Sequence, residues 1–258
     1  MLGTKSAALF ATVKRLAIIT GLYRPVRWLS RRIRPYELRT FEGDIELFRS
    51  LLPRGALCFD VGAYIGEKSE ALLDAGARVV AFEPNPLVLP ELKARCGHRK
   101  DWALVEAALG SGPAIATLYA RNGQSGLAHE WEGRVIATYH VPVVTLDSAI
   151  QFFGRPRYCK IDVEGWELEV LKGLTQSIPL VSFEFHLTDP DVQKTISCLE
   201  RLAQFGPSSV NITPAEASTF HFKEWIPLGE FRAWFPGDLG RSLPGGPYGD
   251  IFVRSDAV

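Results

Sequence analysis

The residues best suited to bind a ligand form a short run after an apolar segment: Asp60-Val61-Gly62-Ala63-Tyr64-Ile65-Gly66. Gly62 allows a tight turn and a close approach of the backbone to a ligand. Gly66 allows the helix that should follow to pack closely on the strand. The first N–H groups of that helix are free and lie at the positive end of its dipole, so they can bind a carboxylate or a phosphate.

The spacing of these glycines indicates which of two kinds of ligand the turn can bind. Dinucleotide-binding folds use Gly-x-Gly-x-x-Gly to hold a pyrophosphate, whereas this run reads Asp-x-Gly-x-x-x-Gly and lacks the middle glycine. A compact zwitterionic head fits the run better. S-adenosylmethionine has such a head, whose carboxylate can meet the helix N-terminus and whose ammonium can meet Asp60. Ordinary turn glycines remain the alternative interpretation of the run.

Two further acids follow the next apolar runs of the chain. Glu83 lies 23 residues after Asp60, directly after the run 79–82. An acid at this position binds a ribose diol in nucleotide-binding sheets. Glu106 ends the following run and is predicted to reach the adenine amino group. Because the acids stand at successive strand ends, we predict that they share one pocket with the glycine turn.

Candidate catalytic residues follow two later apolar runs. Asp162 and Glu164 emerge at the carboxyl edge of the predicted sheet, where they can orient an acceptor or take its proton. Asp162 is also predicted to contact the cofactor. His186 is the best-placed histidine for general-base work because its ordinary pKa is near 6.5, although a lone loop histidine is more often structural. Glu184 can face the acceptor site or pair with a buried cation. These four residues could also bind a divalent metal, but no ligand spacing demands one, and we predict none.

Short β-rich runs alternate with helix-length segments, which predicts βαβ units and a parallel sheet. The core strands are expected at 57–61, 78–82, 103–106, 158–162 and 180–185, with an extra pair at 114–119 and 141–145 and two closing antiparallel strands at 210–213 and 251–254. The helices are expected at about 68–73, 87–95, 166–174 and 191–205. We find no internal repeat or linker that would divide the chain.

The stretch 214–247 is rich in Pro, Gly and aromatic residues and shows no periodicity. A sugar packs its C–H face well on aromatic rings, so Trp225 and Trp234 are candidate acceptor contacts in a lid. The alternative is that these rings cover an open edge of the sheet, since buried aromatic rings are common.

The 258 residues carry no net charge, which disfavours a nucleic-acid binder. Residues 1–36, however, hold eight basic residues and no acid. Their longest apolar stretch, 16–23, is about a third of the ~20 residues that a membrane span needs. It predicts an amphipathic surface helix or helix pair, which is either a cap on the core or a peripheral membrane contact. Four widely spaced cysteines indicate reduced thiols and a cytoplasmic protein.

Six segments between residues 40 and 190 form an ordered set: Phe59 to Glu67, Phe82 to Pro86, Val105 to Gly110, Thr145 to Asp147, Lys160 to Gly173 and Ser182 to His186. Together they resemble the FkbM family of methyltransferases. The resemblance implies an α/β class I methyltransferase sheet of order 3-2-1-4-5-7-6, S-adenosylmethionine as cofactor, and usually O-methylation of a sugar or secondary metabolite. It also implies that Tyr64 and Asn85 contact the cofactor. Tyr64 stands where the family commonly has Asn, and Glu106 stands where Asn is frequent.

The sequence therefore predicts a basic helical extension at 1–40 and an S-adenosylmethionine-binding domain at 41–258. We predict O-methylation of a hydroxyl on a sugar, glycolipid or secondary metabolite, in the cytoplasm or at the inner membrane face. One alternative is a glycan- or membrane-associated binding protein with a vestigial cofactor pocket. A second is an NAD-dependent oxidoreductase. The sequence gives no prediction for the oligomeric state.

Overall fold

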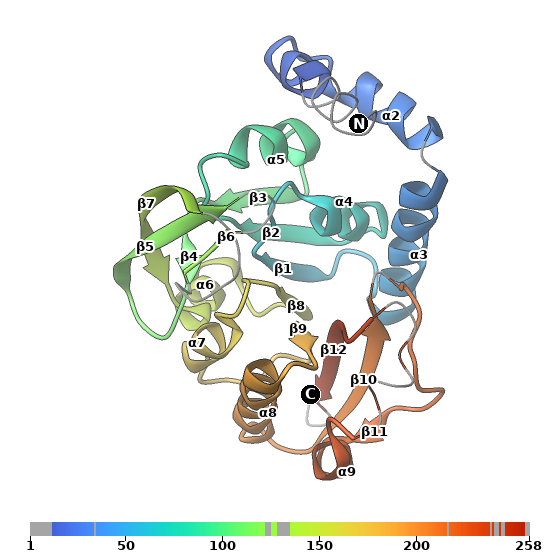
Figure 1. Ribbon diagram of the computed structural model, residues 1–258, viewed down its shortest axis with the longest axis vertical. Helices are drawn as coiled ribbons and strands as arrows, with labels where there is room; N and C mark the ends of the chain where they lie inside the picture. The colour runs from blue at the N-terminus through green and yellow to red at the C-terminus, as the bar shows by residue number, and fades with distance from the viewer. Residues whose placement is uncertain are drawn as a thin grey trace.

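The computed structural model describes residues 12–33, 35–121, 125–127, 135–215, 217–237, 239, 243 and 246–255. Its centre is an eight-stranded sheet of order β11-β10-β12-β9-β8-β1-β2-β3 (Figure 1). The strands are β1 (Leu57–Val61), β2 (Arg78–Phe82), β3 (Trp102–Val105), β8 (Tyr158–Ile161), β9 (Leu180–His186), β10 (Ser208–Pro214), β11 (Ile226–Pro227) and β12 (Tyr248–Ser255). Without the short edge strand β11, this order is the predicted 3-2-1-4-5-7-6.

The five strands β3, β2, β1, β8 and β9 run parallel. β12 lies antiparallel between β9 and β10, which confirms the predicted closing pair. The strands form where the sequence is mostly apolar, because a parallel sheet is covered on both faces. All four residues of β8 are buried, for example, and so are four of the five in β1 and in β2.

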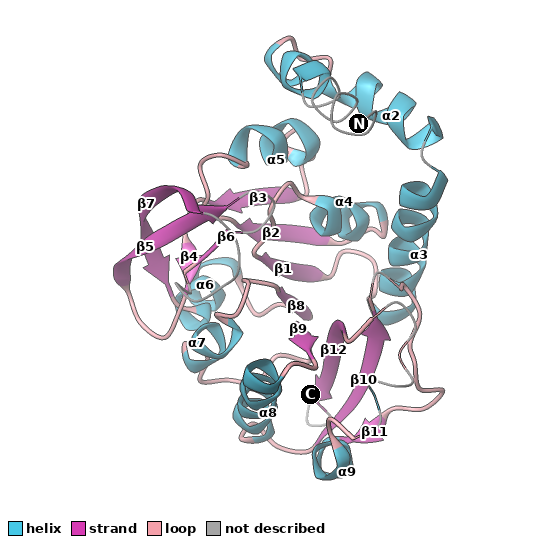
Figure 2. Ribbon diagram, viewed as in Figure 1, coloured by secondary structure: helices cyan, strands magenta, loops and turns pink. Residues whose placement is uncertain are grey.

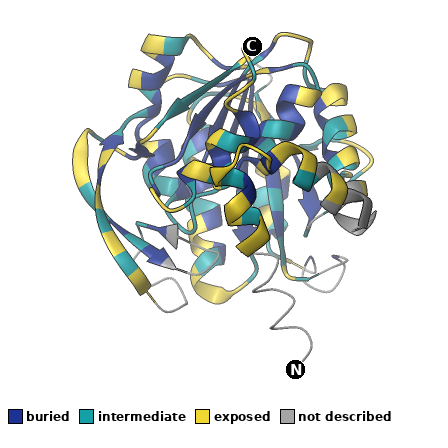
Figure 3. Ribbon diagram, turned by 90° about the horizontal axis from the view of Figure 1, so that it is seen from above, coloured by how far each residue is buried: buried dark blue, intermediate teal, exposed yellow. Residues whose placement is uncertain are grey.

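Helices cover both faces of the sheet (Figure 2). On one face, α3 (Pro35–Leu51), α4 (Glu67–Asp74) and α5 (Leu89–Cys96) pack on a cluster that includes Cys58, Val79 and Tyr158. On the other, α6 (Leu146–Phe153), α7 (Glu167–Lys172), α8 (Asp189–Ala203) and α9 (Leu228–Trp234) pack on a larger cluster around Phe59 and Phe183. Buried residues accordingly concentrate in the central strands (Figure 3).

A small second sheet lies beside the carboxyl end of β3 (Figure 1). It has the order β4-β7-β5-β6 and comprises β4 (Ala108–Leu109), β5 (Ala114–Arg121), β6 (Ser125–Gly126) and β7 (Val135–Val144). β5 and β7 pair antiparallel, as predicted for the extra pair of strands. This sheet supplies one wall of the pocket described below.

The described part of the chain starts with two helices, residues 12–19 and α2 (Tyr23–Ile33), of which α2 lies at the edge of the molecule beside α5 (Figure 1). Within the described residues, no helix combines the length and the apolar character needed to cross a bilayer.

Candidate functional site

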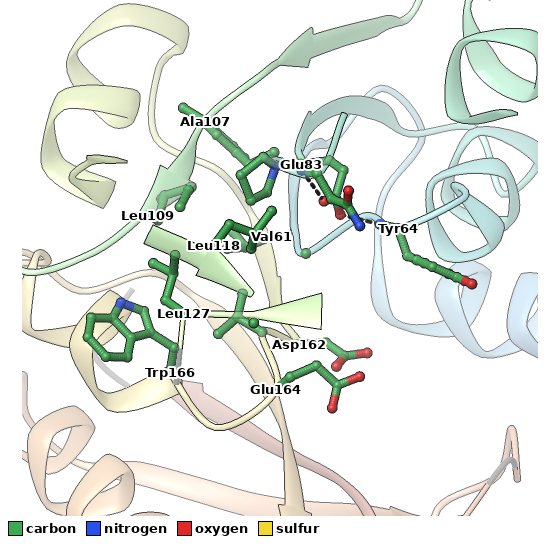
Figure 4. A pocket seen from close by; sticks show the side chains of 17 residues that line it. Val61, Tyr64, Glu83, Ala107, Leu109, Leu118, Leu127, Asp162, Glu164 and Trp166 are labelled. Carbon is green, nitrogen blue, oxygen red and sulfur yellow. Dashed lines mark hydrogen bonds between the residues drawn. The ribbon is translucent and has the colours of Figure 1, made fainter. Parts of the chain in front are cut away.

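A pocket opens at the carboxyl ends of β1, β2 and β8, against the second sheet (Figure 4). It encloses about 760 Å³ of empty space when its open mouth is included. The lining residues are Val61, Gly62, Tyr64, Phe82, Glu83, Pro84, Asn85, Ala107, Ala108, Leu109, Leu118, Gly126, Leu127, Asp162, Val163, Glu164 and Trp166. One side is thus mostly apolar and the other carries three carboxyl groups.

The glycine turn after β1 brings two strand ends together. Gly62 has φ 80°, and a Cβ there would lie 1.7 Å from the carbonyl oxygen of Asp162. Gly66 has φ 84°, and its Cβ would lie 2.6 Å from Cδ1 of Leu92 on α5. Gly66 was predicted to let the helix that follows it pack on the strand. This prediction is wrong about the contacting element, because the close neighbour of Gly66 is the next helix, α5. Tyr64, also at positive φ, lines the pocket mouth and is 42% exposed.

Glu83 is buried at the end of β2, as its predicted role requires. Its two carboxylate oxygens accept hydrogen bonds from the backbone N–H groups of Tyr64 (2.7 Å) and Asn85 (2.8 Å). Burial raises the pKa of Glu83 to about 7 and outweighs these two hydrogen bonds, which lower it. Each oxygen keeps a second lone pair, so the group can still accept from a diol in the pocket. Asn85 in turn accepts from the N–H of Leu87 at 3.0 Å.

Asp60 lies behind the pocket and is not part of its lining. It is 1% exposed, and its Oδ2 accepts a hydrogen bond from the Ser69 hydroxyl at 2.6 Å. Oδ1 has no hydrogen-bond partner among the described residues. Burial raises the pKa of Asp60, with the Lys160 ammonium on the neighbouring strand acting in the opposite direction. Contact of Asp60 with a ligand ammonium stays a prediction.

Lys160 is a buried cation that sequence reasoning passed over. Its Nζ donates to Oδ2 of Asp162 at 2.8 Å, and its side chain is 5% exposed. Burial lowers the pKa of Lys160, but the carboxylates of Asp162, Asp60 and Asp250 more than compensate and raise it. A lysine inside an otherwise apolar strand was the signal available in the sequence. It fixes Asp162 at the pocket wall.

Glu164 lines the pocket next to Asp162 (Figure 4). Its backbone has φ 55°, and its buried Oε2 has no hydrogen-bond partner in the described part of the chain. Burial, followed by the negative charges of Asp162, Glu184 and Glu167, raises the pKa of Glu164 to about 8, against an opposing effect of His186. A carboxyl group that titrates near neutral pH beside a pocket is suited to acid–base chemistry.

The turn that carries Glu164 is held by Glu167, another residue that sequence reasoning did not single out. Oε1 of Glu167 accepts hydrogen bonds from the N–H groups of Val163 and Gly165, both at 3.1 Å. Burial raises the pKa of Glu167 to about 7, opposed by these backbone hydrogen bonds. Glu167 therefore keeps the backbone of residues 163–165 in the conformation that presents Glu164.

His186 and Glu184, predicted near the acceptor, lie outside the pocket lining. They pair with each other, His186 Nε2 to Glu184 Oε2, at 3.2 Å. That hydrogen bond raises the pKa of His186, although burial acts to lower it. The imidazole also stacks on Tyr248 of β12, with ring centroids 5.8 Å apart. The pair is close enough to influence Glu164 electrostatically.

Three other residues that were predicted to contact a ligand, Glu106, Trp225 and Trp234, also lie away from the pocket lining. Glu106 forms a surface ion pair with Lys93 at 2.6 Å, and both side chains are half exposed. The backbone turns after Glu106 so that residues 107–109 line the pocket instead. The predicted adenine contact of Glu106 therefore lacks structural support.

The aromatic rings of 214–247 cover the sheet instead of the pocket. Trp225 packs against Phe220, with centroids 5.2 Å apart, and lies under the Arg254 guanidinium at 4.4 Å. Trp234 packs in the core with Phe231 at 4.9 Å. The predicted lid is thus not formed by these two rings, and their position agrees with the alternative, a cover on the sheet.

Across the described ranges, no group of three or more His, Cys, Asp or Glu side chains is arranged to hold a metal ion. The pocket instead combines an apolar wall, a buried carboxylate with free lone pairs, and two further carboxyl groups at its edge. Such an arrangement can bind a nucleoside through its base and diol, together with a positively charged group near Asp162 and Glu164.

Residues 60–227 match the methyltransferase FkbM domain family. A curated relative, the hexuronic acid methyltransferase AglP of Haloferax volcanii, is 28% identical over 178 residues, which cover 63% of this chain and 71% of the relative. Among solved structures, the precorrin-6y C5,15-methyltransferase of Geobacter metallireducens is 14% identical with a TM-score of 0.44, covering 82% of this chain and 88% of the other. An rRNA methylase of Streptococcus thermophilus is 10% identical with a TM-score of 0.44, covering 82% and 93%.

Proposed function

The chain belongs to the FkbM methyltransferase family, whose members use S-adenosylmethionine, and we propose that it methylates a hydroxyl group of a sugar acceptor. The observation that carries the proposal is the carboxyl group of Glu164, which stands in the pocket without a partner for Oε2 among the described residues. The sugar acceptor is supported by the relative AglP, which is named for a hexuronic acid. Family membership decides against the nicotinamide alternative.

The lining fits S-adenosylmethionine in the chemistry of its groups. Glu83 has lone pairs for the ribose hydroxyls, and the apolar side chains of Phe82, Leu109 and Leu118 can pack on the adenine. The negative charges of Asp162 and Glu164 favour a cation near the pocket edge. When bound, the cofactor supplies an electrophilic methyl group on a sulfonium, and the protein supplies positioning.

Glu164 is the general base of the proposed reaction. An alcohol is a weak nucleophile at neutral pH, so a side chain should take its proton as the new bond forms. The pKa of Glu164 is about 8, and a cation bound beside it would lower that value and favour the ionised form. His186 is less suited to this role because it lies outside the lining and its Nε2 pairs with Glu184.

The role of Lys160 gives a testable prediction. Lys160 does not line the pocket, so we expect it to act through Asp162. Lys160→Met is expected to lower kcat/KM by about tenfold or more, and most of this loss should disappear in an Asp162→Asn background. The four proteins of this double-mutant cycle would show a coupling energy of about 1–3 kcal/mol.

Lys68→Met serves as the control for that cycle. Lys68 of α4 also forms an ion pair, with Asp44 of α3 at 2.8 Å, but this pair does not include Asp162. The Tm values of Lys68→Met and Lys160→Met, each compared with wild type, show how much stability is lost when an ion-paired ammonium is removed. Additive effects of Lys160→Met and Asp162→Asn on kcat/KM would confine Lys160 to a role in stability.

The acceptor class is tested by transfer of a labelled methyl group. Purified protein with labelled cofactor is offered free hexuronic acids, their neutral hexose counterparts, lipid-linked sugars, and amines. We expect label on a sugar oxygen, with hexuronic acids preferred to hexoses. Label on nitrogen or carbon would contradict O-methylation. Cofactor binding without transfer to any acceptor would instead support the vestigial binding protein.

A further inference from the structure

Each of the two N-terminal helices turns some of its polar side chains toward the domain. On residues 12–19, Nζ of Lys14 pairs with Oε2 of Glu91 at 2.7 Å. On α2, the Tyr23 hydroxyl donates to Oε1 of Glu91 at 2.8 Å, and Nη2 of Arg27 donates to Oε2 of Glu70 at 2.6 Å. The helices are therefore anchored to α4 and α5 by ion pairs and hydrogen bonds.

The anchoring surface explains this orientation. Glu67, Glu70 and Glu91 surround the buried guanidinium of Arg95 at 3.3–3.5 Å. The Arg95 side chain is 2% exposed, and one cation cannot balance three carboxylates. The remaining negative charge attracts the basic side chains of the N-terminal helices, which leaves their other face to the outside.

That outer face is apolar. Its side chains, which we call the N-terminal ridge, are Val13 (42% exposed), Leu16 (56%), Ile19 (71%), Leu22 (57%) and Leu29 (55%). Val13, Leu16 and Ile19 follow one another at intervals of three residues and so lie along one side of their helix. A helix on a water-facing surface normally buries its apolar side and exposes its charged side. Here a row of apolar side chains faces outward as well, so something other than water should cover the ridge.

The charges around the ridge identify the cover. Arg15 and Arg24 are exposed beside it, and residues 1–36 contain eight basic residues and no acid. Apolar side chains next to exposed cations are typical of helices that lie in the interface of an anionic membrane. Two copies of the same cationic face would repel each other, which disfavours self-association through it.

We propose that the N-terminal ridge binds an anionic lipid surface, with the helices of residues 12–19 and α2 lying on the bilayer. Leu16 and Ile19 enter the acyl region, and Arg15 and Arg24 meet the lipid phosphates. The ion pairs with Glu70 and Glu91 hold the domain against the bound helices. This docking is independent of the proposed methyl transfer.

Vesicle sedimentation tests the proposal with the full chain. Wild-type protein is expected to bind vesicles that contain phosphatidylglycerol and to stay free with phosphatidylcholine alone. Leu16→Ser together with Ile19→Ser should weaken binding by about tenfold or more, since each side chain loses its apolar burial in the bilayer. The matched control combines Ile115→Ser and Phe152→Ser, because these two are 71% and 82% exposed elsewhere on the surface. The control should bind as wild type does.

A charge variant completes the test: Arg15→Gln with Arg24→Gln should reduce both the affinity and its dependence on salt. The proposal is overturned if wild-type protein does not bind phosphatidylglycerol vesicles. It is also overturned if the Leu16 and Ile19 double variant binds them as strongly as wild type does. A dimer in analytical ultracentrifugation that this double variant dissociates would assign the ridge to a second copy instead. Calorimetric titration with S-adenosylmethionine shows that each variant is folded and keeps this outcome separate from that of the methyl-transfer assay.

Discussion

Glu164→Gln is expected to lower kcat by about a hundredfold or more, while the Kd for S-adenosylmethionine changes only a few-fold. Glutamine keeps the size of the side chain but cannot take a proton from the acceptor. The cofactor still has the Glu83 and Asp162 carboxylates and the apolar wall of the pocket. Single-turnover kinetics with labelled cofactor measure the first quantity, and calorimetry measures the second.

The same substitution has a second expected effect, on stability. The pKa of Glu164 rises from 4.5 to about 8 in the folded protein, so the folded state holds the proton more tightly than the unfolded state does. The stability contributed by the protonated form is complete below pH 4.5 and is lost as the pH rises through 8. Glu164→Gln cannot lose it. The variant should therefore have a higher Tm than wild type at pH 9 and nearly the same Tm at pH 5.

Glu106→Gln is the control for both measurements, because Glu106 pairs with Lys93 on the surface and lies outside the pocket lining. It should leave kcat unchanged. Turnover by Glu164→Gln at the wild-type rate would remove Glu164 from the mechanism and return attention to Asp162.

Gly62→Ala is expected to lower the free energy of unfolding by more than about 3 kcal/mol and to abolish cofactor binding. A left-handed backbone costs a residue with a Cβ about 1–2 kcal/mol. In addition, the new Cβ would lie 1.7 Å from the carbonyl oxygen of Asp162, so the ends of β1 and β8 must separate. That separation moves the turn away from Asp162 and widens the pocket between them.

Gly55→Ala separates the two causes. Gly55 has φ 76°, close to the 80° of Gly62, but a Cβ there would meet nothing within 4 Å. We expect Gly55→Ala to lose only the stability that the left-handed backbone conformation costs, and to bind S-adenosylmethionine as wild type does. Urea unfolding and calorimetry of the two variants make the comparison. Equal losses of stability would show that the contact with Asp162 relaxes freely, and retained binding by Gly62→Ala would contradict the proposed geometry of the turn.

The sequence by itself determined the central strands and the acids that end them. The runs at 57–61 and 78–82 are strands with the predicted bounds, because a strand buried on both faces is mostly apolar and only Asp60 and Arg78 interrupt these two runs. Glu83, Asp162 and Glu164 were each predicted at the carboxyl edge of the sheet and all three line the pocket, because the carboxyl ends of parallel strands lie at one edge.

Side chains whose position depends on elements distant in sequence could not be placed in this way. His186 ends the core strand β9, but the late strand β12 pairs beside it and brings Tyr248 against its ring. Glu106 directly follows the strand β3, yet Lys93 of the preceding helix holds it at the surface. Trp225 meets Arg254 of β12, and Trp234 meets Phe222 outside its own helix, which no local pattern identifies.

The N-terminal helices show most clearly what only the tertiary structure decided. Their basic and apolar composition was plain in the sequence, but not which side faces outward. That depends on Glu70 and Glu91, which lie 43 and 68 residues from their partners Arg27 and Tyr23. The hydrophobic pattern of a segment predicts its local structure, because a helix or a strand buries its apolar side in a similar way in every fold. The direction in which a charged helix faces is set by the field of the residues it meets, and those are brought together only by folding.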